Sequence, residues 1–106
     1  WVFTHRRFGV PEGADIRFVQ GAVQPVHDQM LEVAGARDVW VVGGGELAGQ
    51  FYDSGRLNGL ILTIASTTLG AGAPLFPRRT APPLRLNSVT QFGADFAELR
   101  YDVIYA

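Results

Sequence analysis

The chain has 106 residues, a length that suits one domain, and its 47% hydrophobic and 18% charged residues are typical of a globular domain rather than a disordered chain. The formal net charge of −1, without a basic stripe, argues against nucleic acid or a membrane surface as a partner. The absence of Cys excludes disulfides, thiol nucleophiles and cysteine-bound metal, and a cytoplasmic location is the default expectation.

The first half of the chain combines short apolar runs with one amphipathic segment. Residues 1–5 and 16–20 are rich in aromatic and β-branched residues, which predicts two short strands. Apolar residues at helical spacing predict a helix near residues 24–34. The nearly continuous apolar run over residues 38–43 is typical of a strand covered on both faces.

The second half of the chain contains one predicted helix and three predicted strands. A short helix is predicted over residues 45–55, followed by a buried strand over 60–67. A loop rich in Gly and Pro covers residues 68–83. Polar and apolar residues then alternate over 84–92 and 96–105, which predicts an antiparallel hairpin.

This order of elements predicts an α/β fold, with a mixed sheet and helices on its faces. Trp40 and Phe51 are expected in the core. His27 has no second His or carboxylate at helical spacing and is interpreted as a solvated helix residue.

Three consecutive glycines, Gly43 to Gly45, join the predicted strand 38–43 to the next helix. The first N–H groups of a helix lack partners inside it and attract anions, and glycine lets a ligand approach the main chain. A sharp turn without a ligand explains the glycines equally well. Ala48 stands at the last position of a GxGxxG pattern, and no acidic residue follows at the spacing that holds a ribose, so an ordinary Rossmann domain is a poor explanation.

Four pieces of the sequence resemble the C-terminal part of the dihydrofolate reductase fold, and the resemblance covers about residues 1–105. They are the strand that ends in "GGGEL", the helix that closes in "DSGRLNGL", the strand "LILTIA" and the loop "LGAGAPLFP". The closing "LRLNSVTQFG" and "ELRYDV" are similar to the family's last hairpin. The resemblance is greatest to the bacterial subgroup that includes the reductase domain of riboflavin biosynthesis, the RibD C-terminal type.

The resemblance implies a three-layer α/β/α sandwich with a mixed sheet and a C-terminal antiparallel hairpin. It implies NADPH as the cofactor, with its diphosphate on a glycine turn whose first peptide, Gly43–Gly44, is cis. It assigns no metal and no catalytic residue. The cofactor-binding residues that it implies are Thr4, His5, Arg6, Gly43, Gly44, Gly45, Glu46, Leu47 and Ala48.

Two of these assignments have plain alternatives. Thr4, His5 and Arg6 would meet the 2′-phosphate of NADPH, because a dianionic phosphate favours an Arg fork and hydroxyl donors. The same residues also fit an exposed loop with ordinary charges. Thr63 is implied on the substrate side, although a buried Thr satisfied by its own sheet is an equal alternative.

The family domain carries a further N-terminal stretch with a central strand and, in dihydrofolate reductases, the acidic proton donor. Residues 1–106 are therefore expected to form a single partial domain that does not turn over substrate alone. Its exposed sheet edge would favour a homo-oligomer or pairing with the missing N-terminal part.

The implied function is that of an NADPH-dependent reductase, in which hydride passes to a small-molecule substrate that is a pterin or a ribosylaminopyrimidine. The alternatives are a non-catalytic cofactor-binding or dimerising fragment of the same fold, and a structural α/β domain that uses the glycines only as a turn.

Overall fold

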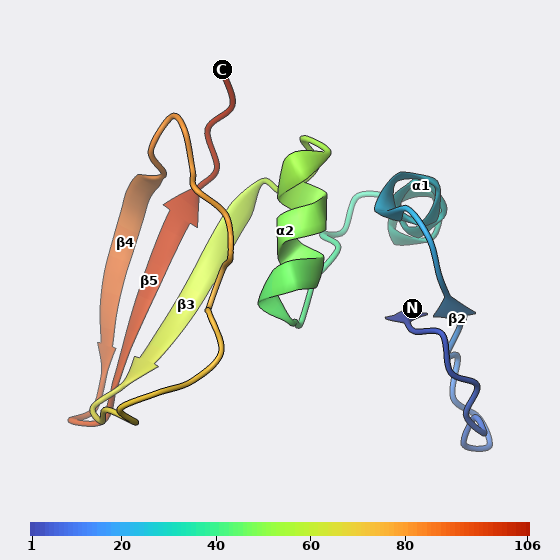
Figure 1. Ribbon diagram of the computed structural model, residues 1–106, viewed down its shortest axis with the longest axis horizontal. Coiled ribbons are helices and arrows are strands. Elements are labelled where there is room, and N and C mark those ends of the chain that lie inside the picture. The colour runs from blue at the N-terminus through green and yellow to red at the C-terminus, as the bar shows by residue number, and fades with distance from the viewer. The chain divides into compact units, whose positions relative to one another are not determined.

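The computed structural model describes all residues, 1–106, and the chain forms two compact units (Figure 1). The first unit is Trp1–Trp40 and the second is Val41–Ala106. The elements in chain order are β1 (Val2–Phe3), β2 (Phe18–Val19), α1 (Val23–Ala34), α2 (Gly45–Asp53), β3 (Gly59–Ala65), β4 (Arg85–Phe92) and β5 (Phe96–Asp102).

The first unit contains a short parallel strand pair and one helix. β1 pairs with β2 in parallel, with Val2 opposite Phe18. α1 buries Val23, Val26 and Met30, which recur at helical spacing along one face. The helix ends where the Gly35 N–H donates to the Leu31 carbonyl, with Gly35 at a φ of 60° that favours glycine. The predicted helix near 24–34 is confirmed.

The apolar run over residues 38–43 differs from its prediction. It forms no strand, because a strand requires a hydrogen-bonded neighbour and no strand of this chain pairs with it. Trp40 and Val42 are 82% and 81% exposed. The predictions of a covered strand at 38–43 and of a core position for Trp40 are therefore wrong.

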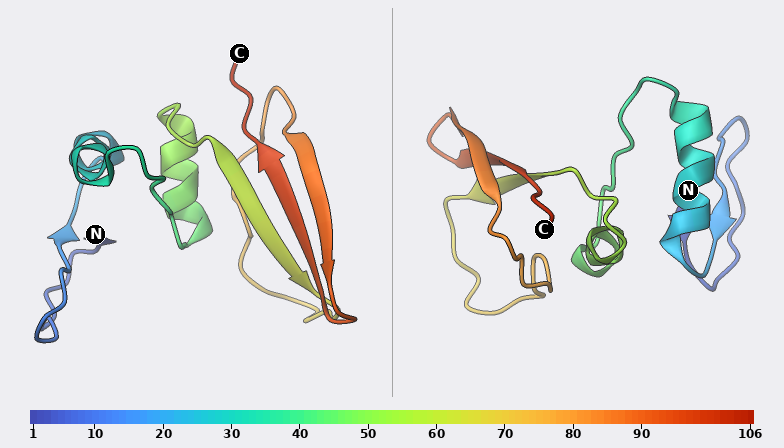
Figure 2. Two further views of the ribbon diagram at one scale, coloured as in Figure 1. Left: turned by 180° about the vertical axis from the view of Figure 1, so that it is seen from behind. Right: turned by 90° about the horizontal axis from the view of Figure 1, so that it is seen from above.

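The second unit is built on a three-stranded antiparallel sheet in the order β3-β5-β4 (Figure 2). β4 and β5 form the predicted hairpin, and their turn contains Gly93 at a φ of 62°. β3 lies at one edge and pairs only with β5. Ile61 and Ile64 of β3 are 59% and 52% exposed, so the prediction of a buried strand over 60–67 is wrong about its burial.

The parallel and the antiparallel strands belong to two separate sheets, whereas one mixed sheet was expected. A single sheet needs strands that join the two sets by hydrogen bonds, and the unpaired run over 38–43 provides no such ladder. Both kinds of pairing together with two helices still make this an α/β chain, as predicted.

The core of the second unit centres on Phe51 of α2, which is 2% exposed, and the prediction for this residue is confirmed. Leu57 and Val103 are the other buried apolar residues of this unit. The Tyr105 hydroxyl accepts the Leu57 N–H at 3.2 Å and donates to the Leu57 carbonyl at 2.9 Å. These bonds fix the C-terminal segment to the chain that follows α2. Neither helix has the length and apolar character needed to cross a bilayer.

Candidate functional site: the glycine turn before α2

The glycine turn leads directly into α2, which begins at Gly45. Gly44 is the N-cap residue, with extended backbone angles and no side chain that could satisfy the first N–H groups of the helix. The Gly43–Gly44 peptide is cis, as the resemblance implied. Gly43 has a φ of 157°, which residues other than glycine rarely adopt. The turn thus presents bare main chain at the positive end of a helix.

The space around the three glycines distinguishes their roles. A β-carbon built on Gly43 or Gly44 meets no heavy atom within 4 Å, so their main chain is open. A β-carbon on Gly45 would collide with the main-chain carbonyl of Leu75. Gly45 is therefore required by the protein's own loop, whereas Gly43 and Gly44 leave room for another molecule.

The three residues after the turn lie on the first turn of α2. Glu46 is exposed, while Leu47 and Ala48 are half-buried. A carboxylate in the first turn of a helix is stabilised by the helix dipole. The pKa of Glu46 is lowered, mainly because its carboxylate accepts hydrogen bonds from Arg78. The Glu46 carboxylate is thus bound by another residue of the chain, Arg78.

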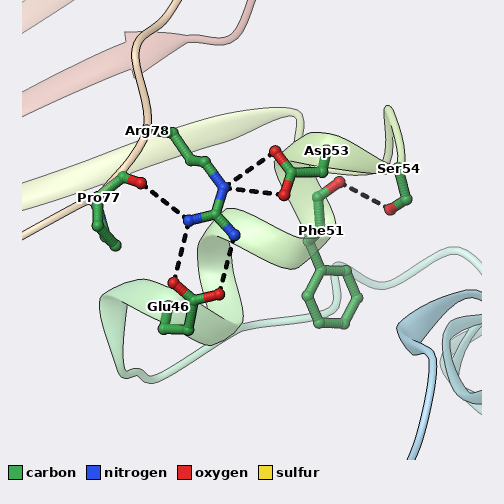
Figure 3. A network of polar contacts seen from close by, with 6 residues as sticks. All are labelled: Glu46, Phe51, Asp53, Ser54, Pro77 and Arg78. Atoms are coloured by element: carbon green, nitrogen blue, oxygen red, sulfur yellow. Dashed lines mark hydrogen bonds and ion pairs between the residues drawn. The ribbon is translucent and has the colours of Figure 1, made fainter.

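Arg78 is the functional candidate that the sequence alone did not identify (Figure 3). Its guanidinium donates to both carboxylate oxygens of Glu46, at 3.0 and 2.9 Å, and from Nε to both oxygens of Asp53, at 3.0 and 2.8 Å. Nη1 also donates to the Pro77 carbonyl at 2.8 Å. These bonds raise the pKa of Arg78, first through Glu46 and then through Asp53. The sequence signal that could have indicated this site was the pair of carboxylates, Glu46 and Asp53, seven residues apart in one helix.

Thr4, His5 and Arg6 lie just after β1 in the first unit, whereas the glycine turn belongs to the second. The Thr4 hydroxyl accepts the Arg6 main-chain N–H at 3.0 Å. The Nδ1 atom of His5 lies 2.8 Å from the side-chain oxygen of Gln20. Both contacts lie within the first unit, and the side chains of His5 and Arg6 are exposed to solvent.

Thr63 lies in the middle of β3, directly opposite Glu98 of β5. Its side chain is exposed, so the alternative of a buried Thr satisfied by its own sheet does not apply. Residues that face each other across an antiparallel pair share one side of the sheet. Thr63 therefore presents its hydroxyl on the same side as the Glu98 carboxylate.

Comparison with known proteins places these features in a family. Residues 17–97 match the model of the RibD C-terminal domain. A curated relative, the uncharacterized protein YwjB of Bacillus subtilis (strain 168), is 37% identical over 57 residues, which are 53% of this chain and 33% of that protein. A solved structure, that of a pyrimidine reductase-like protein from Corynebacterium diphtheriae, matches with a TM-score of 0.67 at 21% identity.

The structural match covers 89% of this chain and 41% of the other. This chain therefore spans about a third of the curated relative and about two fifths of the solved one. At this identity the structural likeness shows the α/β fold alone. The family match is wider, since it covers most of the chain and includes α1, the glycine turn, α2, β3 and β4. The chain belongs to the RibD C-terminal domain family.

Proposed function

We propose that this chain supplies the cofactor-binding part of an NADPH-dependent reductase of the RibD C-terminal type. The observation that carries the proposal is the open main chain at Gly43 and Gly44, where an added β-carbon would meet nothing of the protein. The turn stands at the start of a nine-residue helix whose first N–H groups lack a side-chain cap. Membership of the family and the likeness to a pyrimidine reductase-like protein support the same reading.

The residues of the chain would bind and orient the cofactor. Main-chain N–H groups of the glycine turn and of the first turn of α2 would hold the diphosphate, aided by the helix dipole. Arg6 and the Thr4 hydroxyl would hold the 2′-phosphate, with His5 beside them. Thr63 would lie on the substrate side.

NADPH supplies the hydride when bound, and the protein supplies binding, orientation and electrostatics. The acceptor that we propose is a C=N or C=O carbon of a pterin or of a ribosylaminopyrimidine. The proton donor is not assigned to a residue of this chain.

The experiment is calorimetric titration of the full chain with NADPH, in its original form and as the Gly44→Ala variant. Gly44 has a φ of −81° and a ψ of −177°, which Ala also adopts, so the variant adds one methyl group without backbone conflict. That methyl group would separate the diphosphate from the main chain. Loss of one hydrogen bond to a charged group corresponds to a roughly 10- to 100-fold weaker Kd.

Gly72→Ala is the matched control, because a β-carbon there also meets nothing within 4 Å and φ is not positive. Its affinity for NADPH should equal that of the unchanged chain. If Gly44→Ala also bound NADPH with the original affinity, the diphosphate assignment would be wrong. Equal affinities for NADH and NADPH would remove the 2′-phosphate assignment.

A second candidate role is that of a non-catalytic module that associates with a second copy of this chain. It is favoured by one side of the antiparallel sheet, where the large apolar residues Ile64, Leu86 and Val89 are at least half exposed. Exposed apolar patches of this kind accompany association. Analytical ultracentrifugation that finds only monomer over a wide concentration range would exclude the role.

A further inference from the structure

The loop between β3 and β4 contacts the helix that follows the glycine turn. Gly45, Gly49 and Asp53 recur at four-residue spacing on α2, and Glu46 lies beside them, so these positions share one face. At the N-terminal end of this face, Gly45 adjoins the Leu75 carbonyl. The loop therefore meets the helix at its first turn, immediately after the open glycines.

Gly49 makes room for the guanidinium of Arg78. A β-carbon at this position would lie 2.8 Å from Cζ and 3.0 Å from Nη1 of Arg78. The guanidinium thus lies against the helix main chain and reaches a carboxylate on each side, Glu46 and Asp53 (Figure 3). The side chain of Arg78 is only 21% exposed, whereas those of its two partners are more than half exposed.

The pair with Glu46 has an electrostatic consequence for the first turn of α2. An unpaired carboxylate there would repel a diphosphate held by the neighbouring N–H groups, since like charges a few ångströms apart are unfavourable. The Arg78 fork engages both oxygens of Glu46 and offsets part of that charge, since the same cation also pairs with Asp53. Asp53 engages the remaining edge of the guanidinium, which fixes its orientation.

We propose that Arg78 is a positioning residue for the cofactor diphosphate. Its fork holds residues 75–78 against Gly45 and Gly49 and offsets part of the charge of Glu46, so that the first turn of α2 accepts an anion. The inference rests on the proposed function, because it assumes that the glycine turn binds the diphosphate.

The test measures NADPH affinity of the full chain by calorimetry for Arg78→Met and for the double variant Glu46→Gln/Arg78→Met. Arg78→Met should weaken binding by roughly 2- to 30-fold, the range expected when a residue coupled to a binding site is removed. The double variant should regain part of the affinity, because the unbalanced carboxylate is gone. The loss in Arg78→Met should also shrink as salt is raised, because salt screens the repulsion.

Arg79→Met is the matched control, because it removes the same charge from the neighbouring exposed position. It should change the affinity less than about twofold, as expected for an exposed charge. Circular dichroism of each variant checks that the chain is folded. If Arg78→Met does not fold, Arg78→Lys replaces it, which keeps the cation and loses the fork; this variant should bind NADPH more weakly than the unchanged chain.

The outcomes separate the two proposals. An unchanged chain that does not bind NADPH overturns the proposed function, and this inference with it. An unchanged chain that binds, together with Arg78→Met or Arg78→Lys of equal affinity, overturns the role of Arg78 alone. A weakened Arg78→Met that Glu46→Gln does not relieve overturns the electrostatic role of Arg78, since loss of the loop contact alone would give that result.

Discussion

Replacing Gly49 by Ala should stabilise the protein only when Arg78 is absent. Gly49 is a buried position inside α2. Ala is a better helix former than Gly by about 0.5–1 kcal/mol in a helix interior, because the unfolded chain then has fewer conformations to lose. In an otherwise open position the substitution would therefore stabilise the protein.

A contact between position 49 and Arg78 offsets the stabilisation expected from Ala in the helix. The new β-carbon would lie 2.8 Å from Cζ of Arg78 and 3.1 Å from its Nε, closer than carbon atoms pack. The guanidinium is the flexible end of its side chain and can shift, but a shift disturbs its bonds to Glu46 and Asp53, and this opposes the helix gain. Overpacking of this kind costs about 1–3 kcal/mol, which equals or exceeds the helix gain.

The assay is equilibrium urea unfolding of four chains, namely the unchanged protein, Gly49→Ala, Arg78→Ala and the double variant. Gly49→Ala should lower the free energy of unfolding, or leave it unchanged, when Arg78 is present. In the Arg78→Ala background the same substitution should raise it by about 0.5–1 kcal/mol. The same stabilisation in both backgrounds would show that the guanidinium does not lie on Gly49 and would refute the described packing.

Three further predictions concern stability and its dependence on pH. Phe51→Ala should lower the free energy of unfolding by about 3–5 kcal/mol in urea, because the ring is 2% exposed and leaves a cavity; a loss under 1 kcal/mol would place the core elsewhere. Tyr105→Phe should cost about 1 kcal/mol through the lost bonds to Leu57. Burial raises the pKa of Tyr105 above 10.0. The contribution of Tyr105 to stability is therefore complete below pH 10.0 and is lost as the pH rises through the pKa of the folded state. Tyrosinate absorbance of Tyr105 that titrates at the ordinary pKa would contradict this. Arg78 lowers the pKa of Glu46 below 4.5. Glu46 therefore contributes stability above pH 4.5, and this contribution is lost as the pH falls through the pKa of the folded state. The unfolding midpoints of Glu46→Gln and of the unchanged chain should differ at neutral pH and converge in acid.

Local sequence signals predicted the elements whose stabilising contacts are local. The spacing of Val26 and Met30 predicted α1, and its end at Gly35 follows from the positive φ of that residue. The alternation on either side of Gly93 predicted the hairpin of β4 and β5. The burial of Phe51 followed from its place on the apolar face of α2.

The wrong predictions concern residues whose environment depends on distant partners. The apolar run around Trp40 indicates that such a segment is suited to burial, but it does not specify which strand would pair with it. Ile61 and Ile64 are exposed although β3 pairs with β5, because burial of their side chains needs a covering layer that the strand pattern does not specify. The Arg78 contacts join residues 25 and 32 positions apart, and no local pattern sets the register of a loop on a helix.

The candidate site was foreseen in part. The cis peptide between Gly43 and Gly44 is confirmed, although it came from a family resemblance and not from the glycines themselves. The different roles of the glycines could not be predicted from the sequence, because they depend on the distant Leu75 carbonyl, which lies against Gly45 and leaves Gly44 open. The assignment of Thr4, His5 and Arg6 to the 2′-phosphate stays a prediction.

The most direct measurement follows the backbone amide resonances of Gly43, Gly44 and Gly45 by NMR while NADPH is added to the full chain. We expect saturable shifts at these three amides with one common Kd, and an unchanged resonance at Gly72. NADPH binding that leaves the three amides unmoved, or no binding at all, would contradict the claim that this bare main chain holds the diphosphate.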